Sequence, residues 1–363
     1  MTGRGDPGIV VTGACGLVGS AVTRELIRRG HRVLATDLDT AANRAAIEKV
    51  GRDVRGKGSV SAIWADITDI DQVREVFAHA PITAVIHLAG IIPPFCYAKP
   101  DLAYRVNVRG TENLVTALED TAADCRFVLA SSVAVHGPRN PHTCDDLLDA
   151  TTPTAAADVY GDTKVLAEHA VRGSALPWLI LRLGGVIDDR PNLRPDPDLR
   201  EFERVLPGDG RLQTVSVGDA ARAFAAAATA DTSGECYMIG GDDSHRLRQE
   251  QLSQRISGAM GLPGVVGASA HGDPDDDAAW FATDWMDTRE AQRALSFQEQ
   301  SFDGLLATIG RRMGLLRMVF RVIAPVAAIT RRATDRNPVD QSRPVDPWAA
   351  ASARWGDTRA RSR

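Results

Sequence analysis

Short apolar runs alternate with amphipathic segments through the first half of the chain. Six runs have the length and composition of buried strands: residues 9–11, 32–37, 61–66, 84–90, 126–132 and 178–184. The segments between them, such as SAVTRELIRRG and VRGTENLVTALED, repeat apolar residues at helical spacing. Strands that are apolar on both faces and alternate with helices indicate a parallel sheet covered on both sides. We therefore predict an α/β fold with a doubly wound sheet over residues 8–182.

The pattern changes after Gly184. Residues 185–210 are rich in proline and aspartate and poor in periodicity, which predicts a loop with a short helix. A strand and a helix return at residues 214–230, which we expect to rejoin the sheet. Residues 183–213 and 236–310 then form a smaller mixed α/β region, to which we assign substrate binding.

Residues 311–363 form a basic C-terminal extension, predicted to begin as an apolar helix and to continue as an extended chain. They contain 12 arginines and 4 aspartates, a net charge of +8. One interpretation is a helix that lies on anionic lipid; another is an arm that packs on its own domain or on a partner subunit. Pro325 interrupts the helical pattern, and this favours packing. Trp348 and Trp355 also favour docking, because exposed tryptophan is unfavourable.

Charge and composition exclude several classes of function. The 363 residues carry a net charge of −5, so residues 1–310 carry −13, which argues against nucleic acid as the main ligand. The five cysteines are scattered, with no CxxC pair and no histidine at metal-ligand spacing. Free thiols in a reducing compartment are expected, and no metal site. The first residues lack an apolar run of signal-peptide length, so we expect a cytoplasmic protein.

The sequence VVTGACGLVGS places three glycines between the first strand and the first helix. Gly13, Gly16 and Gly19 permit a tight turn, close approach of a pyrophosphate, and close packing of helix on strand. The helix start offers free N–H groups and a positive dipole end to phosphate. This pattern predicts a dinucleotide site, in which Cys15, Leu17 and Val18 lie between the glycines and share the contact.

Asp37 ends the second predicted strand. A carboxylate at this place accepts hydrogen bonds from the adenine ribose and repels a 2′-phosphate, which favours NAD over NADP. Asp39 is a competing candidate for this role, and Arg44 could reach a phosphate.

The sequence YGDTK places Tyr160 and Lys164 four residues apart, on one face of a helix. This spacing alone occurs often by chance. Several further segments fall in an order that resembles the extended short-chain dehydrogenase/reductase family, which includes nucleotide-sugar epimerases and dehydratases. They are TGACGLVG, the Ala-Asp pair at 65–66, HLAG at 87–90, NVRGT at 107–111, SSVAVHG at 131–137 and YGDTK itself. The resemblance covers about residues 8–305.

The resemblance implies a Rossmann-type fold, NAD as cofactor, a homodimer and a set of site residues. Ser132, Tyr160 and Lys164 would be catalytic, with Ser131 as the neighbour of Ser132. Asn107 would organise an active-site water. Asp66 and Ile67 would contact adenine, and Leu88, Ala89 and Gly90 would line the phosphates and ribose. Candidate substrate contacts are Ser132, Tyr160, His136, Arg182 and Gly184.

The chemistry follows from the residue types. A free phenol has a pKa near 10, which makes it a poor base at neutral pH. The Lys164 charge and an oxidised nicotinamide both favour the phenolate of Tyr160. Ser132 would donate a hydrogen bond to the substrate oxygen as hydride moves.

Departures from the family pattern bear on the substrate. Val133 and Ala134 stand where dehydratases carry an Asp–Glu pair, which argues against dehydration. The segment after Gly184 is short and Ser216 replaces a usual histidine, which favours a smaller or less anionic substrate. Four arginines leave a phosphate or carboxylate possible: Arg182, Arg190, Arg194 and Arg211.

Three functions are compatible with these residues. We expect net oxidoreduction of a hydroxyl or ketone group on a small or sugar-like substrate. Epimerisation by transient oxidation would use the same residues. A dinucleotide-sensing regulator is the non-catalytic alternative, although such proteins lose the tyrosine or lysine that this chain keeps.

Overall fold

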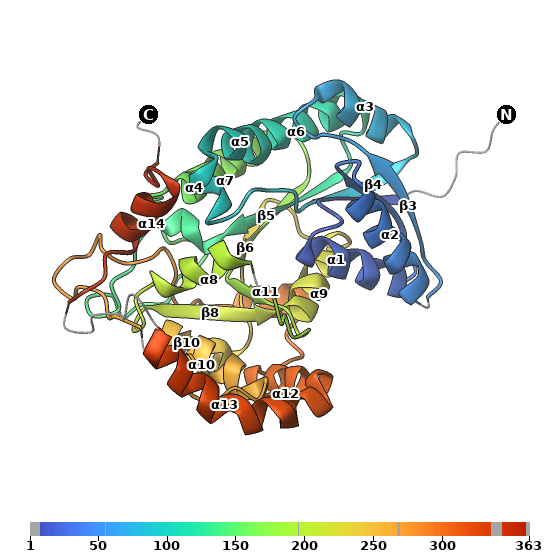
Figure 1. Cartoon of the computed structure of the whole chain (residues 1–363). Coiled ribbons are helices and arrows are strands. Elements are labelled where there is room, and N and C mark those ends of the chain that lie inside the picture. Colours follow the sequence, from blue (N-terminus) through green and yellow to red (C-terminus); the bar gives the residue numbers. More distant parts are fainter. Residues whose placement is uncertain (1–7, 55, 195, 267–268, 335–342, 361–363) are drawn as a thin grey trace.

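A computed structural model describes residues 8–54, 56–194, 196–266, 269–334 and 343–360, and its centre is a seven-stranded parallel sheet (Figure 1). The strand order is β3-β2-β1-β4-β5-β6-β9. The strands are β1 (Gly8–Thr12), β2 (Arg32–Asp37), β3 (Ser59–Trp64), β4 (Ile82–His87), β5 (Arg126–Ser132), β6 (Trp178–Leu183) and β9 (Glu235–Ile239). The predicted doubly wound α/β fold is confirmed.

Helices cover both faces of this sheet and close two apolar cores. One core involves α1 (Leu17–Arg28), α2 (Ala41–Asp53), α9 (Val217–Ala227) and α11 (Arg289–Leu295). The other involves α3 (Ile70–Ala78), α6 (Gly110–Thr121) and α7 (Val159–Arg172). Alternate residues of the strands enter opposite cores: Val11 lies in the first and Val10 in the second. This explains why the strands are apolar throughout.

Three short helical segments link β4 to α6. They are α4 (Phe95–Ala98), α5 (Pro100–Tyr104) and a π-helical turn over Arg105–Arg109. Single π-helical turns are frequent at functional sites.

A smaller lobe packs beside the sheet. Its three-stranded sheet has the order β10-β8-β7, formed by β7 (Gly185–Ile187), β8 (Arg211–Ser216) and β10 (Arg246–Arg248). The helices α10 (Gln249–Ala259) and α12 (Phe302–Met313) supply its core through Ala259, Phe302, Leu305 and Ile309. A short helix, α8 (Pro197–Arg204), lies in the connection between β7 and β8.

The boundaries of the two regions differ from the sequence-based prediction. β8 joins the small sheet rather than the large one, and only α9 of the predicted 214–230 unit packs on the large sheet. β9, which we had placed in the substrate-binding region, is the seventh strand of the large sheet. The apolar pattern of a buried strand does not say which sheet will receive it.

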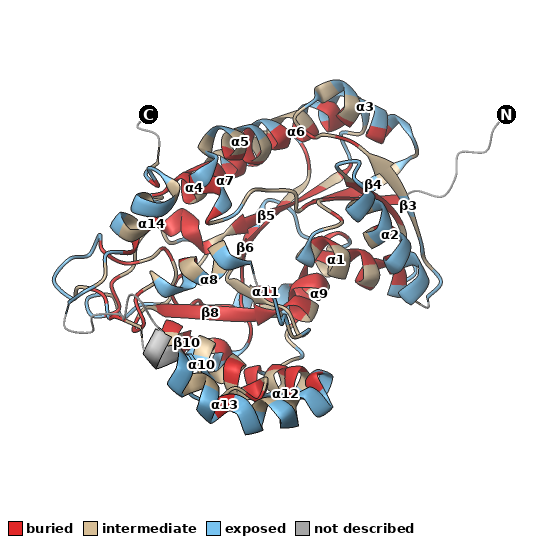
Figure 2. Ribbon diagram, viewed as in Figure 1, coloured by how far each residue is buried: buried red, intermediate tan, exposed pale blue. Residues whose placement is uncertain are grey.

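The C-terminal extension forms two helices, α13 (Leu315–Thr334) and α14 (Pro347–Trp355). The helix α13 continues through Pro325, so the expected interruption is wrong. Part of the stretch expected to be extended is helical in α14. Figure 2 shows the difference between the two helices: α13 lies outside the small lobe and is largely exposed, whereas α14 packs against α4.

Candidate active site

The glycine turn meets the end of the neighbouring strand β4. Gly13 has a φ of +64°, which favours glycine, and a Cβ on it would lie 2.7 Å from the Ala89 nitrogen. A Cβ on Gly19 would lie 2.0 Å from the Gly13 carbonyl oxygen. The turn therefore sits at the point where the strand order reverses, between β1 and β4. Ligands of doubly wound folds bind at such switch points.

Asp37 lies directly beside this turn. The Cys15 backbone N–H donates to its carboxylate at 3.0 Å, and the Asn43 side-chain amide donates at 3.2 Å. Burial and the neighbouring Asp37 carboxylate raise the pKa of the Cys15 thiol to about 12, so this thiol stays protonated. Asp39 and Arg44 instead pair with each other at 2.6 Å on the exposed surface.

The loops that follow β3 and β4 are also fixed by hydrogen bonds. The Asp66 carboxylate accepts from the backbone N–H and the hydroxyl of Thr68 at 2.9 and 2.8 Å. Ile67 is buried, and a Cβ on Gly110 would strike its side chain at 2.6 Å. The backbone N–H groups of Leu88 and Ala89 donate to the Thr12 hydroxyl at 3.2 and 3.3 Å.

Figure 1 places these loops with the glycine turn along the carboxyl edge of the sheet. Leu17 and Val18 open α1 at the same edge, just after Gly16, which is the N-cap residue of the helix.

Tyr160 and Lys164 occupy adjacent turns of α7. The Lys164 ammonium lies 5.8 Å from the centre of the Tyr160 ring and donates a 2.8 Å hydrogen bond to the Ala130 carbonyl oxygen. This bond fixes the lysine at the end of β5, two residues before Ser132. The three predicted catalytic residues therefore lie together, as the motif spacing suggests.

Burial and neighbouring polar groups shift the pKa values of Tyr160 and Lys164 in opposite directions. Burial raises the pKa of Tyr160, and the Ser132 hydroxyl beside it lowers that pKa. Burial also lowers the pKa of Lys164 to about 8, with Glu168 acting in the opposite direction. Lys164 is thus mainly charged at neutral pH and able to stabilise a phenolate.

Asn107 lies on the π-helical turn and holds the loop after β4. Its side-chain oxygen accepts from the Ile91 N–H at 2.7 Å, and its amide group donates to the Ile91 carbonyl and to the Thr163 hydroxyl, both at 3.0 Å. A Cβ on Gly90 would lie 3.2 Å from Asn107 and 3.5 Å from the Lys164 nitrogen. These contacts assign Asn107 a positioning role between Gly90 and α7. The predicted role toward a water stays a prediction.

His136 and Arg182 belong to a buried network on the body of α7. Arg182 donates two hydrogen bonds to Glu168, at 2.9 and 2.8 Å, and lies 3.3 Å from the His136 ring. Ser131 donates to the same carboxylate at 2.6 Å. Burial lowers the pKa of His136 to about 4, which keeps the ring neutral. Protein partners engage the polar atoms of Arg182 and His136, and the predicted contacts of these two residues with substrate stay predictions.

The other polar candidates for substrate contact are largely engaged as well. Arg190 pairs with Asp188 at 3.1 Å, and the buried Arg211 donates to the carbonyls of Cys144 and Pro141 at 2.7 and 2.8 Å. Ser216 is the N-cap residue of α9. Gly184 is packed so closely that a Cβ would lie 2.3 Å from the Gln213 carbonyl. The lack of a side chain at Gly184 therefore lets the end of β6 pack against β8.

Asp158 is a site residue that the sequence analysis missed. It is the N-cap residue of α7, accepting from the N–H groups of Tyr160 and Gly161 at 3.2 and 3.1 Å, and it accepts from the Tyr97 hydroxyl at 2.7 Å. Burial raises its pKa to about 6. An Asp two residues before the tyrosine, at a helix start, is a signal that could have identified it.

The C-terminal segment docks on this same helix start. The Val159 N–H donates to the Thr358 carbonyl at 2.9 Å, and the Ala360 N–H donates to the Ala157 carbonyl at 3.1 Å. These two bonds form an antiparallel bridge between Asp158 and Arg359.

An apolar cluster next to Tyr160 joins three separate parts of the chain. Phe202 of α8 lies 6.1 Å from Tyr97 and 5.8 Å from Trp355, measured between ring centres. Trp348 lies 5.2 Å from Phe281 and donates its indole N–H to the Trp280 carbonyl at 2.9 Å. Tyr160 packs against this cluster, which we call the aromatic wall. No local sequence signal links α14 to Tyr160.

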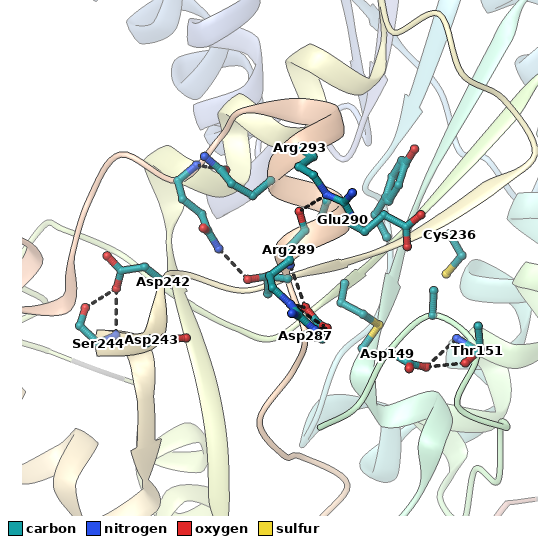
Figure 3. Close-up of a pocket in the computed structure, with 17 residues that line it drawn as sticks. Asp149, Thr151, Cys236, Asp242, Asp243, Ser244, Asp287, Arg289, Glu290 and Arg293 are labelled. Carbon is teal, nitrogen blue, oxygen red and sulfur yellow. Dashed lines mark hydrogen bonds and ion pairs between the residues drawn. The ribbon is translucent and has the colours of Figure 1, made fainter. Parts of the chain in front are cut away.

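A separate cavity of about 1050 Å³ opens between β9, α11 and the segment 149–151 (Figure 3). Two of its charged side chains, Arg289 and Asp287, pair with each other and approach to 2.5 Å, as Figure 3 shows. None of the predicted catalytic or cofactor residues lines it. This cavity is distinct from the site at Tyr160.

Comparison with known proteins agrees with this geometry. Residues 9–240 match the model of the NAD dependent epimerase/dehydratase family. UDP-arabinose 4-epimerase 1 of Arabidopsis thaliana is 29% identical over 217 residues, which are 56% of this chain and 50% of that protein. UDP-glucose 4-epimerase of Bacillus subtilis is 34% identical over 167 residues, 45% of this chain and 47% of that protein. The chain spans about half the length of these curated relatives.

Solved structures share the fold over a larger part of the chain. The UDP-glucose 4-epimerase of Thermus thermophilus, solved as a complex with NAD, superposes with a TM-score of 0.67 at 21% identity, covering 84% of this chain and 98% of that chain. The UDP-glucose 4-epimerase of Bifidobacterium longum, in complex with NAD+ and UDP, also gives 0.67, at 20% identity and with coverage of 85% and 99%. With the family match over residues 9–240, the chain belongs to the NAD dependent epimerase/dehydratase family.

Proposed function

We propose that this protein is an NAD-dependent enzyme of the extended short-chain dehydrogenase/reductase type that acts on a secondary hydroxyl or ketone group. The single observation that carries the proposal is the placement of Tyr160, Lys164 and Ser132 at the carboxyl edge of the sheet. Gly90 joins them to the loop that faces the glycine turn. A bound NAD would supply the hydride acceptor and donor for this chemistry.

The residues present fit such a cofactor. The backbone of the turn lies close to Ala89 because Gly13 has no side chain, and the start of α1 has no side-chain cap on its N–H groups. These groups are suited to a pyrophosphate. Asp37 is suited to an adenine ribose and disfavours a 2′-phosphate. Because Arg44 is paired with Asp39, it offers less to NADP, which supports NAD.

Tyr160 is the proposed proton carrier. In the oxidative direction its phenolate removes the hydroxyl proton of the substrate, and in the reductive direction its phenol gives that proton back. The charge of Lys164 stabilises the phenolate, and the Ala130 carbonyl holds the lysine in place. Ser132 donates a hydrogen bond to the substrate oxygen, stabilising the charge that develops there.

The surroundings of Tyr160 support a small or sugar-like substrate with little negative charge. The aromatic wall lies beside the phenol, and Arg182, Arg190 and Arg211 are engaged by protein groups. Net oxidoreduction of such a substrate is our first candidate.

Epimerisation of a nucleotide sugar by transient oxidation is the second candidate. The names of the curated relatives favour it, since both are UDP-sugar 4-epimerases. It uses the same three residues, followed by return of the hydride to the opposite face. For the protein as a whole we propose a cytoplasmic homodimer; free thiols at the buried Cys96, Cys125 and Cys236 suit a reducing compartment.

One experiment separates the candidates. The protein is incubated with NAD and, separately, UDP-glucose, UDP-arabinose and a panel of sugars and secondary alcohols. Reduced nicotinamide is followed by absorbance and products by NMR. Net oxidation gives one reduced cofactor per product, whereas epimerisation gives a new sugar without accumulation of reduced cofactor. Absence of both across the panel, with NAD bound, would favour the regulatory alternative.

A further inference from the structure

The helix α13 exposes a continuous apolar face. Eight large apolar side chains on it are strongly exposed: Leu315, Leu316, Met318, Val319, Val322, Ile323, Val326 and Ile329. Among the residues that the structure describes, only six other large apolar side chains are exposed in this way, and they are scattered along the chain. Val322 is 78% exposed and Leu315 81%. Concentrated apolar exposure of this kind marks an interaction surface.

The eight residues lie on one side of the helix. At 100° per residue they cover a sector of about 160°, centred near Val326. Ala324 points the opposite way and is 1% exposed, which identifies the side that packs on the small lobe. At the start of α13, the Arg317 carbonyl lies against Gly261, where a Cβ would approach it to 2.5 Å. The helix is therefore anchored by one side, with its apolar side turned outward. Figure 2 shows much of the α13 ribbon in the pale blue of exposed residues.

The charge around this face has one sign. Between Asp303 and Asp335 the sequence contains six arginines and no acidic residue: Arg311, Arg312, Arg317, Arg321, Arg331 and Arg332. Arg311 and Arg321 are exposed, and Arg312 pairs with Asp189 at 3.0 Å. The rest of the chain is acidic, so this cationic segment is a local feature. Arg317 lies on the side of α13 that packs on α12, so the exposed Arg321 is the described arginine of α13 nearest the apolar face. An apolar helix face within a segment of positive charge matches an anionic lipid surface.

The structure favours a helix that lies on a membrane over one that crosses it. In the described part of the chain, no single helix has the length and hydropathy of a membrane span. The helix α12 and residues Leu315–Thr330 reach that length and hydropathy only when they are taken together, and the two helices are bent by 97° relative to each other. The apolar side chains of α12 are buried in the core of the small lobe, so they are not free to enter lipid. Of these two helices, α13 is the one that presents large apolar side chains outward.

We propose that α13 is a peripheral membrane-docking helix that binds anionic bilayers in the plane of the interface. Its apolar face enters the boundary between headgroups and acyl chains, and the neighbouring arginines contact anionic headgroups. A second copy of the chain is a less suitable occupant. Two α13 helices packed face to face would bring two sets of arginines together, with no acidic residue in either segment to compensate.

Vesicle co-sedimentation of the full-length protein tests the proposal. Vesicles of phosphatidylcholine alone are compared with vesicles that also contain phosphatidylglycerol. We expect binding to be at least about tenfold tighter on the anionic vesicles and to weaken with added salt. The test variant is Val322→Glu/Ile329→Glu, which places two charges in the exposed face and should lower vesicle binding at least about tenfold.

The matched control is Lys49→Glu on the exposed surface of α2, which changes the net charge by the same amount. It should bind vesicles like the wild type. An unchanged melting temperature of the double variant shows that it folds, as expected for exposed positions. Three results would overturn the proposal: no anionic-vesicle binding by the wild type, equal binding by the double variant, or a wild-type dimer that the double variant dissociates without any vesicle binding.

Discussion

The two helices of the C-terminal extension have opposite relations to the rest of the molecule. The helix α14 places Trp348 in a hydrogen-bonded aromatic cluster, and the chain after it pairs with the start of α7. The helix α13 places Val322 and its neighbours in solvent. Both segments contain large apolar residues, but those of α14 pack on the rest of the protein, whereas eight of those on α13 are exposed. The comparison indicates that α14 belongs to the active-site region and that α13 is available to an external partner.

Substitution of the docked tryptophan should have the largest effect on stability. Trp348→Ala removes a ring that packs on Phe281 and breaks the bond to the Trp280 carbonyl. We expect a loss of about 3 kcal/mol in the free energy of unfolding. Val322→Ala is the matched substitution on α13 and should change that free energy by less than about 0.5 kcal/mol. Both are measured by urea denaturation.

Equal losses of unfolding free energy in Trp348→Ala and Val322→Ala would contradict the proposed difference between α14 and α13. A large effect of Val322→Ala would mean that α13 is covered within the protein itself.

The pH dependence of stability should report on Asp158, where the C-terminal segment meets α7. Burial raises its pKa from 3.8 to about 6, so the folded state holds the proton more tightly than the unfolded state. Its contribution to stability is therefore present at pH 4 and is lost as the pH rises through about 6. The Asp158→Asn variant has no carboxyl group here and should lack this loss. The difference in unfolding free energy, variant minus wild type, should therefore be about 2 kcal/mol more positive at pH 7 than at pH 4.

Unfolding free energies of both proteins across this pH range give the measurement. A constant difference between the two would show that Asp158 does not titrate in the folded protein as burial implies.

A smaller effect than that of Trp348→Ala is expected for a polar contact of α14. Arg354 pairs with Asp198 at 3.0 Å, but both side chains are about half exposed. Arg354→Ala should lower the free energy of unfolding by less than about 1 kcal/mol. Denaturation at high salt, where the wild type should approach the variant, tests this. A loss as large as that of Trp348→Ala would mean that charge pairs, and not the aromatic wall, stabilise the packing of α14 on the rest of the protein.

The sequence predicted the sheet well because its signals are local. The strands at residues 32–37 and 126–132 match β2 and β5 at both ends, since the apolar runs and their flanking turns define them. Tyr160 and Lys164 were found because YGDTK stands in order with other segments that resemble the family, since the helical spacing alone is common. Gly13 and Gly19 were found because only glycine fits where backbones meet.

The remaining features depend on contacts between distant segments. Arg182 was expected at the substrate, but Glu168, Ser131 and His136 come together around it only in the folded chain. The contact of Trp355 with Phe202 joins α14 to α8, and nothing in either segment predicts it. Pro325 was expected to end a helix, yet α13 continues past it. Local propensity is a weak guide wherever tertiary packing decides.

The central claim is that Tyr160 carries the proton for hydride transfer at a bound NAD. The most direct test is the rate of nicotinamide reduction by the wild type and by Tyr160→Phe in single-turnover experiments with the substrate panel above. We predict a rate lower by about 10²- to 10⁴-fold for the variant, with unchanged affinity for NAD. An equal rate in the two proteins would contradict the claim.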